Sequence, residues 1–304
     1  MAIKKGWVVG GATAVLLSLI GGKLLQQLTG RDPLALPRTS GQHEYALITG
    51  ASSGIGAAFA RRLAQAGYNL VLVARRADRL TTLADDLIQT HGVAVEVLPA
   101  DLTQAADVAR VEQRIAGLQL AILINNAGFG TNKGSLLASD LQAQIDMLNL
   151  HVLTTMRLCR AALPGMTSRG SGAIINVSSI SAFFPSPGDI NYPASKAYMN
   201  TFSRALQAEV APQGIRVQAL CPGFTHTEFH STQVMTGFRK DRVPAAMWMT
   251  SEQVVAESLR CLGRDQVICV PGWRNQLLVL GAQNGLAALV LRVARRFRHR
   301  SDDR

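Results

Sequence analysis

Short apolar runs alternate with helix-length segments along most of this 304-residue chain. The runs are YALIT (45–49), NLVLVA (69–74), VAVEVL (93–98), LAILIN (120–125), AIINVS (173–178), IRVQAL (215–220) and QVICV (266–270). Helix-length segments lie between them, among others at 55–67, 78–91, 104–117, 139–163 and 194–211. Nearly continuous apolar strands that alternate with helices are typical of parallel sheets covered on both faces. The sequence therefore predicts an α/β fold with a doubly wound parallel sheet of about seven strands.

The amino-terminal end has a different pattern. Residues 6–22, GWVVGGATAVLLSLIGG, carry no charge and are bracketed by lysines. This length is the lower limit for a helix that spans a bilayer. We predict that residues 1–28 form an uncleaved membrane anchor; a cleaved signal peptide and a helix packed on the protein are the alternatives. The prolines and polar residues of 29–42 predict a linker to a domain at 43–272.

The carboxyl-terminal end is basic. Residues 273–304 mix apolar stretches with arginines, and six arginines fall in the last 13 residues. This pattern predicts an amphipathic helix at a membrane interface or a helix that closes over the active cleft. The formal charge of +11 is concentrated at the two ends, because residues 39–291 carry 20 basic and 17 acidic residues. Basic ends on a nearly neutral body favour a membrane surface over nucleic acid as a partner.

The four cysteines lie far apart in the sequence, at Cys159, Cys221, Cys261 and Cys269. They have neither the CxxC pattern nor the spacing of metal ligands, so we expect reduced thiols and no metal site. Reduced thiols favour a reducing compartment.

A glycine-rich loop, TGASSGIG (49–56), directly follows the first predicted strand and opens a helix. Gly50, Gly54 and Gly56 allow a tight turn and a close approach of the backbone to a ligand. The helix amino terminus offers unpaired N–H groups to a pyrophosphate. The spacing TGxxxGxG differs from the GxGxxG dinucleotide fingerprint, but its place after the first strand favours dinucleotide binding.

The end of the second strand, VLVARR, bears on which dinucleotide binds. An acidic residue there would hold the adenosine ribose hydroxyls, whereas this chain has Ala74, Arg75 and Arg76. A small neutral residue followed by cations accepts a 2′-phosphate. We therefore predict NADPH in preference to NADH, with Arg75 as the phosphate ligand. The alternative is that both arginines are solvated loop charges, Arg76 in particular.

The motifs of residues 43–272 together resemble those of the short-chain dehydrogenase/reductase family, whose fold is of the Rossmann type. After TGASSGIG come ADL (100–102), NNAG (125–128), NLHV (149–152), VSS (177–179), YPASK (192–196) and CPGFTHT (221–227), in the family's order. The resemblance implies a catalytic set of Asn149, Ser179, Tyr192 and Lys196. It implies cofactor contacts from Gly50, Ser52, Ser53, Gly54, Ile55, Gly56, Arg75, Asp101, Leu102, Asn126, Ala127, Gly128, Tyr192, Lys196, Pro222, Gly223, Thr225 and Thr227.

Tyr192 and Lys196 lie one helical turn apart, which places both on one helix face. In the resembled family, the tyrosine is the general acid of ketone reduction. A free phenol has a pKa near 10, too high for efficient proton exchange at neutral pH. We expect the Lys196 ammonium and the oxidised nicotinamide to stabilise the phenolate; lowering its pKa by about three units takes roughly 4 kcal/mol.

Other residues acquire roles only through the resemblance. Ser179 would hydrogen-bond the substrate carbonyl, and Asn149 would support Lys196 through a water. Thr225 and Thr227 are both placed to bind the carboxamide, and the sequence leaves open which of them does so. Pro193 is tolerated in the first helical turn, where its missing N–H loses no partner.

Residues 224–250 are expected to form a substrate lid. Their apolar side chains are Phe224, Phe229, Met235, Phe238, Met247, Trp248 and Met249, and the opposite wall would contain Phe183, Phe184, Pro185 and Pro187. Adaptable apolar surfaces of this kind favour a lipophilic ligand. The alternative is that these side chains simply pack on the core.

We therefore expect an NADPH-dependent oxidoreductase that reduces a lipophilic carbonyl compound, such as a 3-oxoacyl thioester or a steroid-like ketone. A catalytically silent NADP(H)-binding sensor or scaffold is the alternative. The protein is expected to be membrane-associated, with its catalytic domain in the cytoplasm. The resemblance implies a homodimer or homotetramer formed through the helices at 139–167 and 192–211.

Overall fold

A computed structural model describes residues 44–131, 135–185, 188–231 and 243–283. All of them belong to one unit of the chain, Leu36–Arg304. Seven parallel strands form a single sheet in the order β3-β2-β1-β4-β5-β6-β7. The strands are β1 (Tyr45–Thr49), β2 (Asn69–Ala74), β3 (Val95–Pro99), β4 (Leu120–Asn125), β5 (Gly172–Val177), β6 (Ile215–Leu220) and β7 (Ile268–Cys269). The predicted α/β parallel sheet is confirmed.

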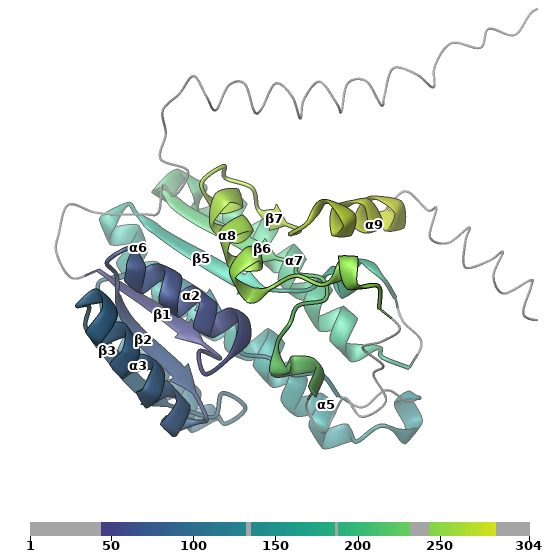
Figure 1. Cartoon of the computed structure of the whole chain (residues 1–304), viewed down its shortest axis with the longest axis horizontal. Coiled ribbons are helices and arrows are strands. Elements are labelled where there is room, and N and C mark those ends of the chain that lie inside the picture. Colours follow the sequence, from purple (N-terminus) through teal and green to yellow (C-terminus); the bar gives the residue numbers. More distant parts are fainter. Residues whose placement is uncertain (1–43, 132–134, 186–187, 232–242, 284–304) are drawn as a thin grey trace, which may run out of the picture. The chain divides into compact units, whose positions relative to one another are not determined.

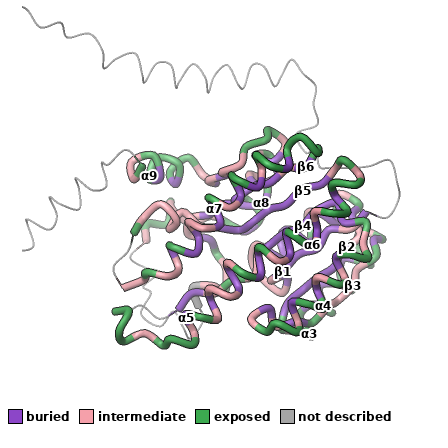
Figure 2. The backbone as a smooth tube through the Cα atoms, turned by 180° about the vertical axis from the view of Figure 1, so that it is seen from behind, coloured by how far each residue is buried: buried purple, intermediate pink, exposed green. Residues whose placement is uncertain are grey.

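Helices cover both faces of the sheet (Figure 1). On one face lie α2 (Gly54–Gln65), α3 (Ala77–His91) and α8 (Ser251–Leu262), with α2 in contact with both of the others. On the other face lie α4 (Ala105–Ala116), α6 (Thr155–Arg169) and α7 (Asn191–Val210); α4 packs on α6, and α7 packs on β6. The five central strands between these layers are almost entirely buried, whereas the edge strand β3 is only half-buried (Figure 2).

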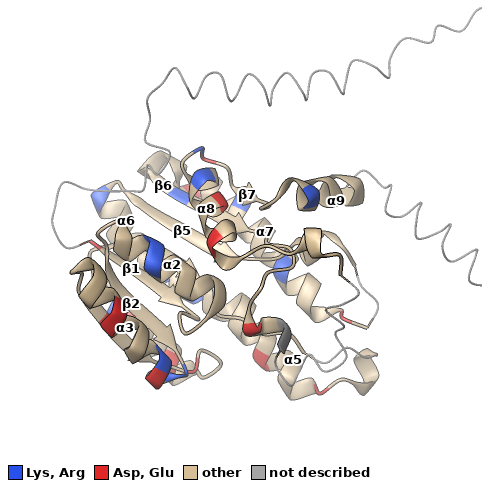
Figure 3. Cartoon of the chain, in the orientation of Figure 1, with Lys and Arg blue, Asp and Glu red and all other residues tan. Residues whose placement is uncertain are grey.

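The core results from alternate strand residues that face opposite helix layers. Leu47, Val71 and Ile174 point into a cluster that contains Val111 of α4 and Leu158 of α6. Burying such side chains contributes roughly 1.5–3 kcal/mol each, so the sheet is a rigid base for the loops that follow its strands. Acidic and basic residues both occur on α3 and on α8, whereas α2 carries basic residues alone (Figure 3).

The predicted helix 139–163 is interrupted in the structure. It consists of α5 (Leu141–Leu148), a π-helical stretch at Asn149–Thr154 and α6. A π-helical turn takes up extra residues and so rotates the following side chains relative to an α-helix. The helix α8 was not predicted, although Thr250 and Gln253 form a capping box at its start.

The ends of the chain fall partly outside this description. The predicted anchor (1–28) and linker (29–42) lie outside the described residues, and those boundaries stay predictions. In the part of the chain that the structure describes, no helix is both long and apolar enough to cross a membrane. Of the predicted tail at 273–304, the structure describes α9 (Trp273–Gln283), on which Trp273, Leu277 and Leu280 are exposed.

Candidate active site

The carboxyl ends of β1 and β4 meet where the strand order reverses, which is the usual ligand crevice of such sheets. Gly50 and Gly54 in the loop after β1 have left-handed backbones, with φ of +65° and +55°. A Cβ on Gly50 would lie 2.8 Å from Nδ2 of Asn126, and a Cβ on Gly56 would collide with the Gly50 carbonyl oxygen. The loop therefore requires glycine for both its conformation and its packing.

Thr49 and Asn126 fasten this loop to the end of β4. The Thr49 hydroxyl donates to the Ile124 carbonyl oxygen at 3.2 Å and accepts from the backbone N–H groups of Asn126 and Ala127 at 2.9 and 3.0 Å. The Asn126 side-chain amide donates to the carbonyl oxygens of Thr49 and Gly50 at 2.9 and 3.2 Å. The two loops are thus positioned as one unit, and the predicted motif NNAG has a structural role here.

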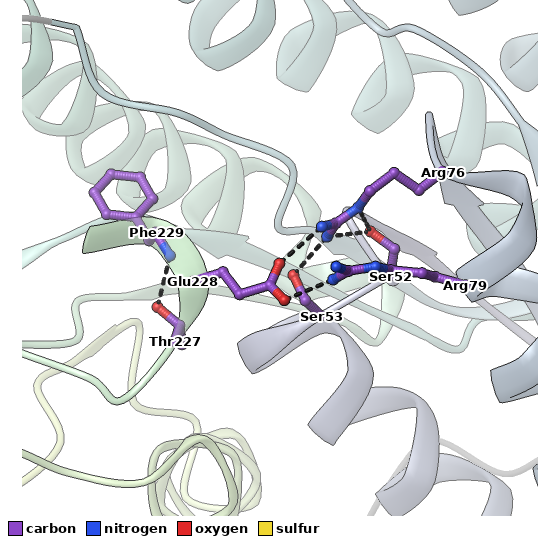
Figure 4. Close-up of polar contacts among 7 residues, drawn as sticks. All are labelled: Ser52, Ser53, Arg76, Arg79, Thr227, Glu228 and Phe229. Carbon is purple, nitrogen blue, oxygen red and sulfur yellow. Dashed lines mark hydrogen bonds and ion pairs between the residues drawn. The ribbon is translucent and has the colours of Figure 1, made fainter. Parts of the chain in front are cut away.

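Arg76 lies over the glycine loop (Figure 4). Its guanidinium donates to the hydroxyls of Ser52 and Ser53, both at 2.9 Å from Nη2. Arg75, the predicted phosphate ligand, is exposed. A solvated Arg76 was expected, but its guanidinium lies against Ser52 and Ser53. The direction of two adjacent side chains depends on the turn after β2, which the sequence alone does not define.

Glu228 approaches the same arginine from the opposite side (Figure 4). Its carboxylate accepts from Nη1 of Arg76 at 2.7 Å and from Nη1 of Arg79 at 2.6 Å. These hydrogen bonds hold the pKa of the Glu228 carboxyl below its ordinary value. Thr227 reaches the loop as well, because its Cγ2 would lie 2.8 Å from a Cβ on Gly54. None of these contacts with residues 227–228 was predicted from the sequence.

The other residues predicted to bind the cofactor lie in the segments that follow β1, β3 and β6. Asp101 is half-buried after β3, and its carboxylate accepts from the backbone N–H and hydroxyl of Thr103. Leu102 is buried beside it. After β6, Pro222 is buried and Gly223 packs against Asn275, which leaves no space for a Cβ on that glycine. Ile55 lies half-buried in the first turn of α2.

The two candidate threonines differ in their surroundings. Thr225 is buried and donates its hydroxyl to the Gly223 carbonyl oxygen at 3.1 Å. The hydroxyl of Thr227 accepts from the backbone N–H of Phe229 at 3.3 Å. Both hydroxyls therefore already contact backbone groups, and the choice between them stays open.

Ser179, Tyr192 and Lys196 converge at the carboxyl end of β5. Ser179 precedes a short 3₁₀ helix, Ile180–Phe183, and accepts from the Ser181 N–H at 3.1 Å. Tyr192 lies in the first turn of α7, where Pro193 is accommodated. Nζ of Lys196 lies 5.6 Å from the centroid of the Tyr192 ring and donates to the Val177 carbonyl oxygen at 3.0 Å. The sequence-predicted trio is thus brought together.

Burial dominates the ionisation of these groups. It raises the pKa of Tyr192 to about 12, against the opposing effect of a hydrogen bond with Ser179. Burial also lowers the pKa of Lys196 to about 7. Burial of the phenol therefore outweighs the hydrogen bond with Ser179, and the lowering of the tyrosine pKa expected from Lys196 together with oxidised nicotinamide stays a prediction.

Asn149 begins the π-helical stretch, and it is half-buried. The structure places His151, two residues further on, against the catalytic groups. The His151 ring is fully buried and meets the Tyr192 ring edge-on, with 5.7 Å between centroids. Sequence analysis missed His151, because a histidine in an apolar helix is usually a core residue and the π-helical turn changes which residues share a face.

Aromatic side chains of the predicted lid lie near Tyr192 and against one another. The Phe229 ring lies 5.9 Å from the Tyr192 ring, and Trp248 packs on Phe224 and His226. Phe183, Phe184 and Pro185 lie half-buried or exposed after β5, and Met247 and Met249 lie in the described part of the lid. Met235, Phe238 and Pro187 lie outside the described residues.

Cys159, Cys221 and Cys269 are buried, Cys261 is half-buried, and all four are free. Within the described ranges, no group of three or more histidine, cysteine or acidic side chains is arranged to hold a metal ion.

Residues 44–236 match the profile of a family described as short chain dehydrogenase. The chain is 34% identical over 259 residues to 17-beta-hydroxysteroid dehydrogenase type 3 of Danio rerio, an alignment that covers 84% of this chain and 80% of that protein. It is 33% identical to very-long-chain 3-oxoacyl-CoA reductase-A of Danio rerio, over 77% of this chain and 74% of that protein. Its structure resembles a short-chain dehydrogenase from Sphingobium yanoikuyae in complex with NADPH, with a TM-score of 0.71 and 37% identity over 81% of this chain and 95% of that chain.

Proposed function

This chain belongs to the short-chain dehydrogenase family, and we propose that it is an NADPH-dependent reductase of a lipophilic ketone or aldehyde. Family membership confirms the resemblance seen in the motifs and makes the protein an oxidoreductase of the dehydrogenase/reductase type. The observation that carries the proposal is the convergence of Ser179, Tyr192 and Lys196 beside the glycine loop. A protein that only bound a nucleotide would not need a proton donor at this place.

The crevice fits a nicotinamide dinucleotide. Gly50 and Gly56 line it without a Cβ, which would collide with neighbouring atoms at either position. The Ser53 side chain does not cap α2. The first N–H groups of α2 therefore remain available for a pyrophosphate. Arg76, with Arg79 beside it, would bind a 2′-phosphate in the place that the Glu228 carboxylate takes in this structure. This arrangement supports NADPH over NADH.

The bound cofactor would supply hydride to the carbonyl carbon. Tyr192 would then donate its phenolic proton to the carbonyl oxygen. A pKa of about 12 keeps the phenol protonated at neutral pH but makes it a weaker acid, so the phenolate left by the step would need stabilisation. Ser179 would hydrogen-bond the same oxygen as negative charge develops. Lys196 would hold the nicotinamide ribose and stabilise the phenolate left by proton donation.

The substrate class is supported by the lid. Phe229 lies against Tyr192, so an apolar surface borders the place where the carbonyl oxygen must arrive. The relatives named above carry steroid and long-chain acyl thioester substrates in their names. We propose a substrate of one of these two chemical classes, a steroid-like ketone or a 3-oxoacyl thioester.

Association with a membrane and with a second copy of the chain are also proposals. The uncharged residues 6–22 support a membrane anchor, with the catalytic domain in the cytoplasm. Exposed apolar side chains follow one another along α5, the π-helical stretch and α6, and they support pairing through this segment. They are Leu141, Ile145, Leu153 and Met156.

The test follows NADPH oxidation by the full-length protein in detergent with steroid ketones, 3-oxoacyl thioesters and aliphatic aldehydes. Tyr192→Phe should lower kcat by roughly 10²–10⁴-fold. Tyr198→Phe is the matched control, because Tyr198 lies on the same helix and stacks on Phe202 instead. Turnover lost in the first variant and kept in the second supports the reductase. Saturable NADPH binding without turnover in any class would favour the sensor alternative.

A further inference from the structure

His151 is a buried titratable residue to which the family resemblance assigned no role. It is 0% exposed and lies on the π-helical stretch between α5 and α6. Its ring meets that of Tyr192 edge-on, and Phe129 faces it from the segment after β4. A polar ring enclosed in this way requires hydrogen-bond partners for both nitrogens.

The first ring nitrogen has a partner that defines the tautomer. Nδ1 of His151 lies 3.0 Å from Oγ of Ser195. The Ser195 hydroxyl donates to the Tyr192 carbonyl oxygen at 2.8 Å, so its oxygen is left to accept. Nδ1 must therefore carry the proton and donate it to Ser195. It follows that Nε2 is an unprotonated acceptor.

The second nitrogen faces the catalytic lysine. Nε2 is buried and has no hydrogen-bond partner among the described residues. The Cβ position of Gly128 would lie 2.8 Å from Nε2 and 3.6 Å from Nζ of Lys196, so both nitrogens border the space that this glycine leaves free. The ammonium has three N–H donors, and the recorded partners are the Val177 carbonyl oxygen at 3.0 Å and the Met199 sulfur at 3.7 Å. One donor remains for an acceptor on this side.

We propose that His151 is a positioning residue of the reduction, whose Nε2 accepts a hydrogen bond from Lys196 through one water. The bond holds the lysine charged and aimed at Tyr192, in addition to the support that the family resemblance implies for Asn149. This inference rests on the proposed function. His151 itself keeps its Nδ1 proton and transfers none.

The electrostatics agree with an acceptor that stays neutral. Burial, and then the charge of Lys196, lower the pKa of His151 well below its ordinary value. The titratable groups recorded against the ring are Lys196 and Tyr192, both from α7. A neutral imidazole beside a buried ammonium favours the charged lysine without competing for its proton.

The test compares His151→Leu, which removes the acceptor at similar volume, with His151→Asn, which retains one. The Nζ titration of Lys196 is followed by NMR in the free protein, so no substrate is needed. His151→Leu should move the Lys196 pKa about one unit further down, since a hydrogen bond to a charged group is lost. His151→Asn should leave it close to the wild-type value. An unchanged Lys196 titration in His151→Leu would overturn the proposal, whatever the activity.

Kinetics form the second arm of the test. In alcohol oxidation, the pH at which kcat rises should move upward in His151→Leu, because the phenolate is less stabilised. The value of kcat at neutral pH should fall by roughly 10-fold or more. Met166→Ala, in the core, controls for a folding defect and should leave the pH profile unmoved. If His151→Leu does not fold, Ser195→Ala tests the same bond. Without the Ser195 hydroxyl, His151 is no longer held in the Nδ1-protonated tautomer, so the pH profile of kcat should shift in the same direction. An unshifted pH profile would contradict the proposal. Lack of turnover in the wild type would instead count against the proposed function.

Discussion

Arg76 and Glu228 form an ion pair of 2.7 Å across the glycine loop, although 152 residues separate them in the sequence. The pair joins the end of β2 to the lid that follows β6. It brings a carboxylate to the place where an NADPH phosphate would bind, so both partners should affect the choice of cofactor.

We expect Arg76→Ala to weaken NADPH binding by roughly 10–100-fold, the loss of one to two charge-assisted hydrogen bonds. NADH, which has no 2′-phosphate, should bind almost as before. Fluorescence titration of both cofactors measures the difference. Arg75→Ala is the control, because Arg75 is adjacent and exposed. A larger loss in Arg75→Ala would mean that the original sequence prediction of Arg75 is right.

Glu228→Gln should have the opposite effect and strengthen NADPH binding several-fold. Arg76 and Arg79 hold the pKa of Glu228 down, so at neutral pH its carboxylate is charged and competes with the phosphate. The ion pairs are about half exposed, with 50% of the Glu228 side chain accessible, so their loss should cost under about 1 kcal/mol of stability. Glu252→Gln, an exposed residue on α8, should change neither quantity. Weaker NADPH binding in Glu228→Gln would show that the carboxylate orders the arginines for the cofactor.

Local sequence patterns predicted the strands of the sheet well, because a strand buried on both faces consists of a nearly continuous run of apolar residues. The bounds of β1, β2, β4 and β6 agree with the predicted runs at every residue. β7 shrinks to two residues at the sheet edge, where pairing is weakest. The positions of Ser179, Tyr192 and Lys196 were predictable, because each follows or opens an element whose bounds the motifs mark.

The remaining features of the site depend on geometry that no local pattern contains. Which of Arg75 and Arg76 points toward the glycine loop depends on the backbone turn after β2. The contact of Glu228 with that arginine requires the lid to fold back over the loop. His151 faces Lys196 because a π-helical turn replaces one α-helical turn, and counting at 3.6 residues per turn does not reveal such an insertion.

Gly128→Ala should impair catalysis without a matching loss of stability. Its Cβ would lie 2.8 Å from Nε2 of His151, so the ring must shift away from Lys196. Gly128 does not have a left-handed backbone, so the substitution itself causes no strain in φ. Gly117→Ala is the matched control, because the nearest atom would lie 3.8 Å from its Cβ. We expect kcat to fall roughly tenfold in the first variant and to stay unchanged in the second, with thermal unfolding of both measured alongside. Equal activities would show that the space beside His151 is not used.

Lys196→Met should inactivate the enzyme and stabilise its fold at neutral pH. Burial lowers the pKa of Lys196 in the folded protein to about 7, whereas an unfolded lysine titrates near 10.4. The unfolded chain therefore binds the additional proton between these values, and the wild-type stability rises with pH across that window. The penalty is full below about pH 7, where a depression of about three units corresponds to roughly 4 kcal/mol. Losing the hydrogen bond to Val177 offsets about 1 kcal/mol of the gain.

The difference in melting temperature between Lys196→Met and the wild type should therefore be several degrees near pH 7 and shrink as the pH approaches 10. Calorimetry of the full-length protein across pH 6–10 measures it, with Arg204→Met, an exposed cation on α7, as the control that should show no such trend. A variant less stable than the wild type at pH 7 would mean that the Lys196 ammonium is stabilised by its surroundings in the fold. We expect Lys196 to destabilise the fold, because burial removes the hydration of its ammonium and its partners in the folded protein return less than that loss.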